Sequence, residues 1–537
     1  MSAGLTFPAQ LNVADYFLDR HLREGRGSRI AVAGVGPPLT YEELTDKAAR
    51  AAGLFREMGL APGERVLLVL PDSPEWLACF YGAIKAGAVA VPVNPFTRAA
   101  DYAYFAADSK PRLAVVHSMS FAEALPALAS STARVVTVGG RADGFDSLEA
   151  LLASASPMRE ARSTAADDIA FFLYTSGSGG QPKAAMHRHR HMLATSATFA
   201  AHVLGIGPGD VCFSASKLFF AYGLGNAGYF PFSVGAATVL LPERVTPEKI
   251  FAVLEEHRPT LFFSVPTIYG ALLRAAEGTA TQLDSVRLCI SAGEALPGEI
   301  FTRFRARFGR EILDGIGTTE MLHMFMSNRA GAARPGSCGP LVPGYEARIV
   351  DEEGREVGDG TVGNLWVRGP SAMAGYWEQA ELTARVLRDG WYSTNDKFTR
   401  DADGFYHYCG RADDMLKVSG LWVSPLEVEN ALLAHDGVAE AAVVGQRDAD
   451  GLTRIVAYVV ARDSSAGGSG HGLLPVAPRG GSRGAEQGSD QSVGMVDELR
   501  AFVHARLPGY KVPQEFRFLA ELPKTATGKI QRFKLRT

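Results

Sequence analysis

The sequence predicts an α/β fold with a large N-terminal domain of mixed sheets flanked by helices and a small α+β domain at the C-terminus. Three observations lead to this prediction. The chain has 537 residues, too many for one ordinary hydrophobic core. Apolar strand-like runs alternate with amphipathic stretches through most of the chain, as in sheets covered by helices. Near Gly410 this pattern gives way to a polar, turn-rich segment and then to a shorter α+β pattern.

The elements of the large domain are predicted from short apolar runs bounded by turn residues. The predicted strands are residues 64–71, 113–118, 134–140, 260–266 and 286–293, and a helix is predicted at 269–278. The most apolar stretch, residues 76–95, is interrupted by Lys85, by glycines and by two prolines. It therefore predicts a buried helix followed by a buried strand, and not a membrane span.

The second domain is predicted to begin after Arg411, which divides the chain into residues 1–411 and 412–537. Its predicted elements are helices at 426–435 and 496–507 and strands at 439–446 and 454–461. Residues 463–494 are rich in Gly, Ser and Pro and cannot bury much apolar surface. We expect them to form a disordered surface loop.

Charge and cysteine content restrict the classes of partner and compartment. Lys and Arg number 54 and Asp and Glu 58, so the formal net charge is −4 and no basic surplus favours nucleic acid or a membrane surface. The five cysteines are scattered and never form a C-x-x-C pair, which is typical of a reducing compartment. The N-terminal residues do not resemble a secretory signal. We expect a cytoplasmic protein, either a monomer or a homodimer.

The segment from Tyr174 to Lys183 is predicted to bind phosphate. It follows the apolar run 169–175, a predicted strand. Its glycines permit unusual backbone angles and close approach of a ligand, while its hydroxyls and free N–H groups suit phosphate oxygens. These residues are Thr175, Ser176, Gly177, Ser178, Gly179 and Gly180. The loop is not a Walker A motif, because Pro182 precedes the lysine. The alternative interpretation is a flexible Gly/Ser loop.

Two further patterns are interpreted as incidental. Residues 223–228 fit G-x-G-x-x-G, but they lie deep inside the domain, whereas a dinucleotide site usually opens the first βαβ unit. Residues 187–191 read His-Arg-His-Arg-His, and we interpret them as a polar helix face in which His187 and His191 share one side. No H-E-x-x-H zinc motif is present.

Six segments in order resemble the motifs of the adenylate-forming superfamily, which includes acyl-CoA synthetases, luciferases and adenylation domains of peptide synthetases. They are residues 174–183, 314–320, 389–396, 410–420, 508–513 and 523–529. The first resembles the family signature Y-T-S-G-T-T-G-x-P-K and departs from it at Ser178 and Gly179. Ala184, directly after this segment, stands where glycine is usual. The match is closest to benzoate–CoA ligases, on D-G-I-G-T-T-E-M-L-H at 314–323 and P-K-T-A-T-G-K-I-Q-R at 523–532.

The resemblance implies that ATP, Mg²⁺ and coenzyme A take part in the reaction. Lys529, Thr175 and Glu320 are implied to be catalytic, and Glu320 with Thr175 to hold the metal. The other residues implied to bind the nucleotide are Ser176, Gly177, Ser178, Gly179, Gly180, Lys183, Asp314, Gly315, Ile316, Thr319, Asp396 and Arg411. Asp396 suits the ribose hydroxyls as an ionised acceptor, and the Arg411 guanidinium suits bidentate contact with ribose or phosphate.

The resemblance also implies an acid pocket and a mobile C-terminal domain. The pocket residues are Phe220, Ala221, Tyr222, Ala292, Gly293, Gly317, His323 and Met324. Small residues beside aromatic ones suit a flat ring. The C-terminal domain is expected to rotate about Asp413 between two half reactions, adenylation and thioester formation.

The predicted activity is ATP-dependent ligation of benzoate or a substituted benzoate to coenzyme A. Two alternatives remain open: another acid, such as a hydroxybenzoate or aminobenzoate, and a stand-alone adenylation enzyme that loads a carrier protein.

Overall fold

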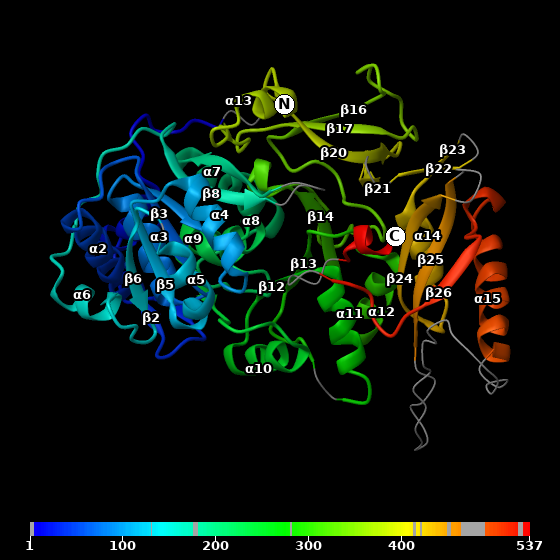
Figure 1. Ribbon diagram of the computed structural model, residues 1–537, viewed down its shortest axis with the longest axis horizontal. Coiled ribbons are helices and arrows are strands. Elements are labelled where there is room, and N and C mark those ends of the chain that lie inside the picture. The colour runs from blue at the N-terminus through cyan, green and yellow to red at the C-terminus, as the bar shows by residue number, and fades with distance from the viewer. Residues whose placement is uncertain are drawn as a thin grey trace. The chain divides into compact units, whose positions relative to one another are not determined.

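The computed structural model describes residues 5–129, 131–175, 181–279, 282–411, 415–418, 421–447, 453–462, 489–524 and 530–536. The chain forms two compact units (Figure 1). The first comprises Met1–Leu296, Ile300–Thr394 and Thr399–His407, and the second Pro297–Glu299, Asn395–Phe398 and Tyr408–Thr537. This division runs through two paired strands near residues 395–411, and a domain boundary after Arg411 stays a prediction.

The first unit contains an eight-stranded sheet in the order β18-β9-β8-β4-β3-β5-β6-β7. The strands are β3 (Arg65–Val69), β4 (Val89–Pro92), β5 (Leu113–His117), β6 (Arg134–Val138), β7 (Asp146–Ser147), β8 (Ile169–Thr175), β9 (Lys183–Arg188) and β18 (Gly375–Tyr376). From β7 to β8 the neighbours are parallel, whereas β9 pairs antiparallel with both β8 and β18. The sheet is therefore mixed, as predicted, and its antiparallel edge carries the phosphate-loop segment.

A second eight-stranded sheet has the order β15-β14-β13-β12-β10-β11-β1-β2. Its strands are β1 (Ile30–Ala33), β2 (Leu39–Thr40), β10 (Val211–Ser214), β11 (Ala237–Val239), β12 (Leu261–Ser264), β13 (Leu288–Ser291), β14 (Ile312–Gly317) and β15 (Met324–Ser327). All neighbours are parallel except at the two ends, β1–β2 and β14–β15. Because the carboxyl ends of parallel strands share one edge, this sheet places the segments after β12, β13 and β14 together.

Helices cover these two sheets. The longer ones are α2 (Tyr41–Glu57), α3 (Pro74–Lys85), α4 (Ala99–Ser109), α5 (Phe121–Leu128), α10 (Pro247–His257), α11 (Pro266–Ala275) and α12 (Gly298–Phe308). The shorter ones are α1 (Arg20–Arg23), α6 (Leu148–Ser154), α7 (His189–Thr195), α8 (Ala221–Gly223), α9 (Phe230–Val234) and α13 (Ala380–Val386), with π-helical segments at Asp15–Asp19, Ser196–Leu204 and Leu224–Tyr229. A buried cluster that includes Phe262, Tyr269 and Phe304 packs α11 and α12 onto the second sheet.

A five-stranded sheet follows in the chain, with the order β16-β17-β20-β19 and β21 paired to β20. Its strands are β16 (Glu346–Val350), β17 (Gly363–Arg368), β19 (Leu387–Arg388), β20 (Trp391–Arg400) and β21 (Tyr406–Arg411).

The second unit has its own hydrophobic core. Its elements are β22 (Leu416–Val418), β23 (Leu421–Val423), α14 (Pro425–Leu433), β24 (Val438–Arg447), β25 (Thr453–Ala461), α15 (Ser489–His504) and β26 (Glu515–Phe518). Val428 and Leu432 of α14 and Leu499 of α15 pack against β24 and β25. Hydrophobic side chains on one face of each helix thus hold both helices to the three-stranded sheet.

The structure confirms the strands and helices predicted from the apolar runs, and it corrects the loop predicted for 463–494. The predicted strands become β3, β5, β6, β12, β13, β24 and β25, and the stretch 76–95 becomes α3 followed by β4, both buried. The disordered loop predicted for 463–494 is wrong for residues 489–494, because α15 begins at Ser489. The prediction was based on the composition of the whole segment and overlooked Ser489 and Asp490, residue types that favour helix N-termini. Residues 463–488 lie outside the described part of the chain.

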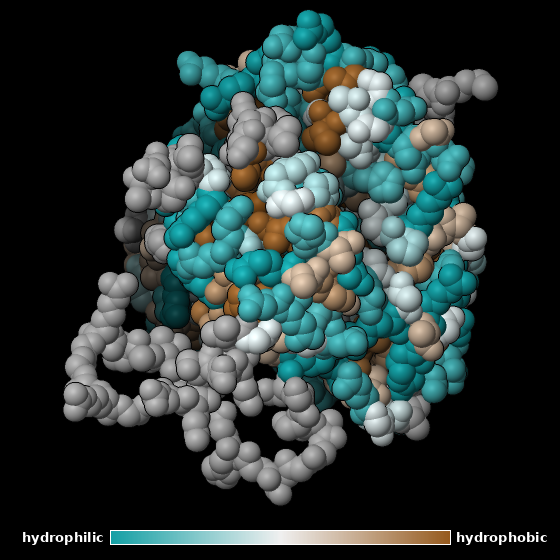
Figure 2. All heavy atoms as spheres, turned by 90° about the vertical axis from the view of Figure 1, so that its right-hand side faces the viewer, coloured by the Kyte–Doolittle hydropathy of each residue, from teal (hydrophilic) through white to brown (hydrophobic). Residues whose placement is uncertain are grey.

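The surface is mostly hydrophilic on the face shown in Figure 2, with small hydrophobic areas between polar ones. In the part of the chain that the structure describes, the exposed large hydrophobic residues come from separate segments: Leu22, Ile30, Met119, Phe145 and Val362. Within the described residues, no helix has both the length and the apolar character needed to cross a membrane.

Candidate active site

The predicted phosphate loop closes a β-hairpin. Strands β8 and β9 pair antiparallel, with Thr175 directly opposite Lys183. The hairpin therefore brings the hydroxyl residue and the cation together at the base of the loop. Ser176, Gly177, Ser178, Gly179 and Gly180 lie outside the described residues, so their predicted phosphate contacts stay a prediction.

Helix α4 anchors both ends of this loop. The Tyr104 hydroxyl donates to the carbonyl oxygen of Pro182 at 2.6 Å, on the side of Lys183. The Tyr174 hydroxyl, on the side of Thr175, donates to Asp108 Oδ2 at 2.6 Å. Burial raises the pKa of the Asp108 carboxyl, and the bond from the tyrosine partly offsets this effect. The helix thus fixes the base of the loop through one residue on each side.

The turn that carries Glu320 is fixed by hydrogen bonds at three consecutive carbonyl oxygens. The turn is the 3₁₀ segment Thr319–Met321, just after β14. Its first carbonyl accepts from His187 Nε2 at 2.9 Å, and its second from the Met373 N–H at 2.7 Å. Its third carbonyl accepts from the Ser371 hydroxyl at 2.7 Å. Donors from β9 and from the segment before β18 therefore hold the whole turn in place.

The Glu320 carboxylate and the Lys183 ammonium meet at one tyrosine. Glu320 is only 7% exposed, and its Oε1 accepts a hydrogen bond of 2.6 Å from the Tyr376 hydroxyl. The Lys183 Nζ lies 5.7 Å from the centroid of the same ring, within cation–π range. Sequence reasoning missed Tyr376 because it lies 56 positions from Glu320, with no local pattern to connect them.

The donor set at Glu320 fits Mg²⁺ bound with a nucleotide. Mg²⁺ usually takes one or two carboxylates and completes its coordination with water and substrate phosphates. A single buried carboxylate near the phosphate-loop lysine matches that pattern. Among the described residues, no group of three or more His, Cys, Asp or Glu is arranged to hold a metal, so an all-protein metal cage is not built there.

The His-Arg-His-Arg-His segment is not the polar helix face that was predicted. His187 belongs to β9, and His189 and His191 to α7, so the first and last do not share a helix face. All three side chains are at most 1% exposed. Two make hydrogen bonds that fix other segments: His187 to Thr319, and His189 Nδ1, which accepts from the Val13 N–H at 3.3 Å. Polar side chains can be buried when they have hydrogen-bond partners, so the polar composition of this segment did not reveal that the histidines are buried.

Asp314 lies at the buried end of β14, within the segment predicted to hold adenine. Its side chain is 5% exposed, and Oδ2 lies 3.4 Å from the Leu296 N–H, while Oδ1 has no hydrogen-bond partner. Burial raises the pKa of Asp314 to about 8. Gly315 and Ile316 continue the same strand and pair with β15.

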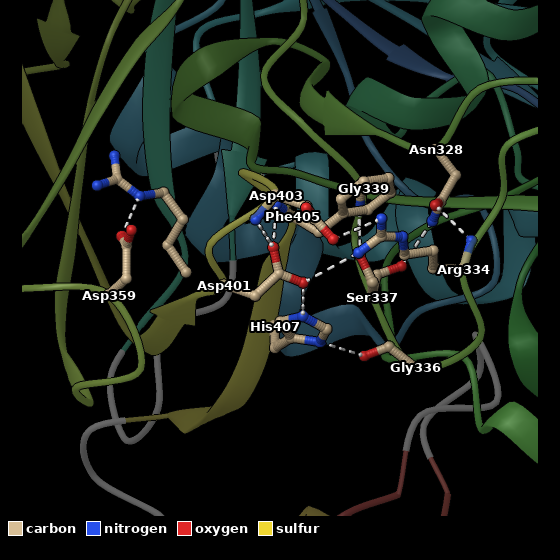
Figure 3. A network of polar contacts seen from close by, with 11 residues as sticks. Asn328, Arg334, Gly336, Ser337, Gly339, Asp359, Asp401, Asp403, Phe405 and His407 are labelled. Carbon is tan, nitrogen blue, oxygen red and sulfur yellow. Dashed lines mark hydrogen bonds and ion pairs between the residues drawn. The ribbon is translucent and has the colours of Figure 1, made fainter.

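Asn328 fixes the main chain of Asp314 by two hydrogen bonds. The Asn328 N–H and its side-chain amide both donate to the Asp314 carbonyl, at 2.9 and 3.0 Å. The amide also donates to Ser337 at 2.6 Å. Figure 3 shows Asn328 and Ser337 beside Arg334, which pairs with Asp401 and Asp403 at 3.4 and 2.9 Å. A polar network thus connects the adenine segment to the β20–β21 turn.

Most of the predicted acid-pocket residues lie at the carboxyl ends of β13 and β14. Tyr222 donates from its hydroxyl to the Ile290 carbonyl at 3.1 Å, which places α8 beside β13. Ala292 and Gly293 follow that strand, and Gly317 pairs with Met324 across β14 and β15. Phe220 precedes α8, which begins at Ala221.

His323 occupies an aromatic cage. Its ring centroid lies 4.6 Å from that of Phe230, 4.9 Å from Phe199 and 5.5 Å from Tyr222. Its Nε2 lies 3.1 Å from Asn226 Oδ1. Burial lowers the pKa of His323 to about 3, so the imidazole is neutral at ordinary pH.

The G-x-G-x-x-G pattern at 223–228 serves close packing and not a dinucleotide site. Most of it forms the π-helical segment Leu224–Tyr229, which does not follow a strand directly. A Cβ atom on Gly225 would lie 2.4 Å from the His323 ring, so only glycine fits there. Glycine at this position therefore lets the segment pack closely against His323, one of the predicted pocket residues.

Asp396 and Arg411 are paired within the second unit. Arg411 Nη1 lies 3.4 Å from Asp396 Oδ1, and the aspartate side chain is 6% exposed. Asn395, next to Asp396, adopts a φ of 61°, a left-handed conformation that asparagine tolerates better than most residues. The predicted catalytic Lys529 and hinge residue Asp413 lie outside the described residues.

Two family descriptions match the chain, and together they cover most of it. The AMP-binding enzyme family matches residues 18–377, and the AMP-binding enzyme C-terminal domain matches residues 427–529. The chain belongs to the AMP-binding enzyme family. This membership confirms the resemblance to adenylate-forming enzymes. Lys183, Glu320 and the acid-pocket residues lie in the first match, and Lys529 is the last residue of the second.

Several AMP-binding enzymes are similar over nearly the whole chain. A benzoate–CoA ligase of Thauera aromatica is 43% identical and covers 99% of this chain and 97% of its own. The crystal structure of a benzoate CoA ligase from Burkholderia xenovorans has a TM-score of 0.87 at 42% identity, with coverage of 98% and 100%. An anthranilate CoA ligase in complex with anthranoyl-AMP has a TM-score of 0.89 at 34% identity, with coverage of 98% and 97%.

Proposed function

We propose that the chain is an ATP-dependent ligase that joins benzoate, or a substituted benzoate, to coenzyme A. In the first step a carboxylate oxygen attacks the α-phosphorus of ATP, and the bond to pyrophosphate breaks. In the second step the thiolate of coenzyme A attacks the carbonyl carbon of the acyl-adenylate, and AMP leaves. The similarity to benzoate–CoA ligases over nearly the whole chain supports this reaction.

One structural observation carries the proposal more than any other. The Lys183 ammonium and the buried Glu320 carboxylate converge on Tyr376, next to a hairpin loop rich in glycine and hydroxyl residues. Adenylation requires two anions to meet, so charge neutralisation and in-line positioning are the main tasks of the protein. A cation and a metal-binding carboxylate on one rigid support suit that task.

The nucleotide residues divide among these tasks. Thr175, Lys183 and the loop residues Ser176–Gly180 bind phosphate oxygens. Glu320 with Thr175 holds Mg²⁺, which neutralises phosphate charge when bound. Asp314, Gly315, Ile316 and Thr319 line the adenine and α-phosphate, Asp396 accepts hydrogen bonds from the ribose, and Arg411 contacts ribose or phosphate.

The acid site suits an aromatic ring. The neutral His323 lies with Nε2 near Asn226, the hydroxyl of the partly buried Tyr222 donates to the Ile290 carbonyl, and small residues adjoin both side chains. Such a lining favours a flat apolar group over a charged one. Phe220, Ala221, Ala292, Gly293, Gly317 and Met324 complete the pocket in this proposal.

The C-terminal residues complete both half reactions. Lys529 bridges the attacking carboxylate and the α-phosphate during adenylation. A rotation of the C-terminal domain about Asp413 then removes Lys529 and admits coenzyme A.

A second candidate function follows from the adenylate chemistry alone. The same first step with a carrier-protein thiol as acceptor would make the chain a stand-alone adenylation enzyme. Hydroxybenzoate and aminobenzoate remain candidate acids within either function, and the similar anthranilate CoA ligase favours testing aminobenzoate.

A panel of acids tests the proposal. Purified protein is mixed with ATP, Mg²⁺ and coenzyme A, and benzoates, cinnamates and fatty acids are offered singly. Mass spectrometry scores each acyl-CoA and the AMP released. Benzoyl-CoA with AMP, and little product from fatty acids, is the expected result. Acyl-adenylate without thioester would favour the carrier-protein alternative, and no product from any aromatic acid would overturn the proposed substrate class.

A further inference from the structure

Tyr376 contacts two charged groups of the candidate site at the same time. Its hydroxyl donates to Glu320 Oε1 at 2.6 Å, and its ring lies 5.7 Å from Lys183 Nζ. We propose that Tyr376 is a positioning residue that fixes the Glu320 carboxylate for Mg²⁺ and couples it to Lys183. This inference rests on the proposed function, because it assigns Glu320 to the metal.

Tyr376 is itself held rigidly. It is 6% exposed, pairs with Ala185 across β18 and β9, and its N–H donates to the Thr383 hydroxyl at 2.9 Å. A fixed ring holds its hydroxyl oxygen at one place, and the O–H of Tyr376 points to Glu320 Oε1. The bond therefore selects one rotamer of the glutamate and leaves Oε2 as the oxygen assigned to the metal.

Strand β9 is the common support of this arrangement. Lys183 begins the strand, and His187 near its end donates to the Thr319 carbonyl, next to Glu320. Tyr376 pairs with the middle of the same strand. One strand thus sets the distance between the lysine, the tyrosine and the metal carboxylate, and no flexible linker intervenes.

The two contacts of Tyr376 reinforce each other. A phenol that donates a hydrogen bond to a carboxylate gains electron density on its oxygen and ring. A more electron-rich ring attracts the ammonium more strongly. Loss of the hydroxyl should therefore release the Glu320 carboxylate directly, and it should weaken the attraction between the ring and Lys183 only to a smaller extent.

The direct test replaces Tyr376 with phenylalanine in the full chain. Y376F keeps the ring and the strand pairing and removes only the hydroxyl. Binding is measured by electron paramagnetic resonance as titration of Mn²⁺ into protein saturated with α,β-methylene-ATP, without any acid. We expect the affinity for Mn²⁺ to fall about tenfold, the size of effect typical of one charge-assisted hydrogen bond. An affinity within twofold of the unmodified protein would overturn the proposal.

A matched control separates positioning from loss of a buried hydrogen bond. Tyr41 is 0% exposed, and its hydroxyl donates to the Ala236 carbonyl at 2.6 Å. Y41F should lower the melting temperature about as much as Y376F without changing the affinity for Mn²⁺. An equal loss of Mn²⁺ affinity in Y41F would show a general effect of destabilisation and contradict the proposal.

A double-mutant cycle tests whether Tyr376 acts through Glu320. In the E320Q background, Y376F should cause no further loss of Mn²⁺ affinity, because the group that it positions is already changed. A further tenfold loss would contradict the proposal. Because the Mn²⁺ titration contains no acid, a wrong choice of benzoate as substrate would not alter its outcome.

Discussion

His187 donates a hydrogen bond from Nε2 to the carbonyl oxygen of Thr319 at 2.9 Å. A carbonyl only accepts, so Nε2 carries the proton. Burial lowers the pKa of His187 to about 4, and the imidazole is therefore neutral with an acceptor at Nδ1. Phe171 stacks on the ring at 5.3 Å, which fixes its plane. A histidine in a polar-looking sequence segment thus holds the turn that carries Glu320.

Replacement of His187 should slow adenylation. H187F fills the space but leaves the Thr319 carbonyl without its donor, at a cost of about 1–3 kcal/mol. We expect the rate of ATP–pyrophosphate exchange to fall about tenfold. H187Q restores an N–H donor and should recover most of that rate. Equal losses in both variants would mean that ring packing, and not the hydrogen bond, explains the effect.

Removal of the Tyr104 hydroxyl should weaken ATP binding. Y104F loses the bond to the Pro182 carbonyl beside Lys183. We expect the KM for ATP to rise several-fold with little change in kcat, because the loop base becomes less ordered. Tyr102 offers a control on the same helix, since its hydroxyl donates to Asn94 at 3.3 Å. A similar rise in KM for Y102F would contradict an anchoring role specific to Tyr104.

Asp314 should make stability depend on pH. Its pKa is raised from 3.8 to about 8 by burial, so between these values the folded chain keeps a proton that the unfolded chain has released. The folded state then binds more protons, and the free energy of unfolding falls as pH rises from about 4 to about 8.

The Asp314→Asn variant isolates this contribution, because an amide does not titrate in that range. We expect its melting temperature to rise, relative to the unmodified protein, by a few degrees as pH increases from 5 to 8. Circular dichroism melts at several pH values measure the difference. A difference that stays constant across this range would show that the carboxyl does not titrate as described.

Gly225 should be intolerant of a side chain. In G225A the new Cβ would lie 2.4 Å from the His323 ring and displace it. We expect kcat/KM for benzoate to fall about tenfold or more, a cost of at least about 1.4 kcal/mol, while the KM for ATP changes little. A Cβ added at Gly207 would meet no atom within 4 Å, so G207A is the matched control. Unchanged kinetics in G225A would exclude His323 from the acid pocket.

Much of the fold and the outline of the site could be predicted from the sequence. Apolar runs such as 113–117 form strands because burial drives them, and a resemblance spread over six segments identified the family. The residues that were missed act over long sequence distances. Tyr376 meets Glu320 only because β18 pairs with β9, and Asn328 meets Asp314 through the β14–β15 turn. The segment His187–His191 was wrongly interpreted as a polar helix face. Polar side chains can be buried when their polar atoms have hydrogen-bond partners inside the protein, and the sequence does not show those partners.

The measurement that tests the central claim most directly follows oxygen from the acid to AMP. Benzoate labelled with ¹⁸O on both carboxylate oxygens is converted with ATP, Mg²⁺ and coenzyme A, and the products are analysed by mass spectrometry. An acyl-adenylate forms through one carboxylate oxygen, so we predict one ¹⁸O in the phosphate of AMP and one in the thioester carbonyl. Unlabelled AMP, or ADP with labelled inorganic phosphate, would contradict adenylation at the α-phosphate.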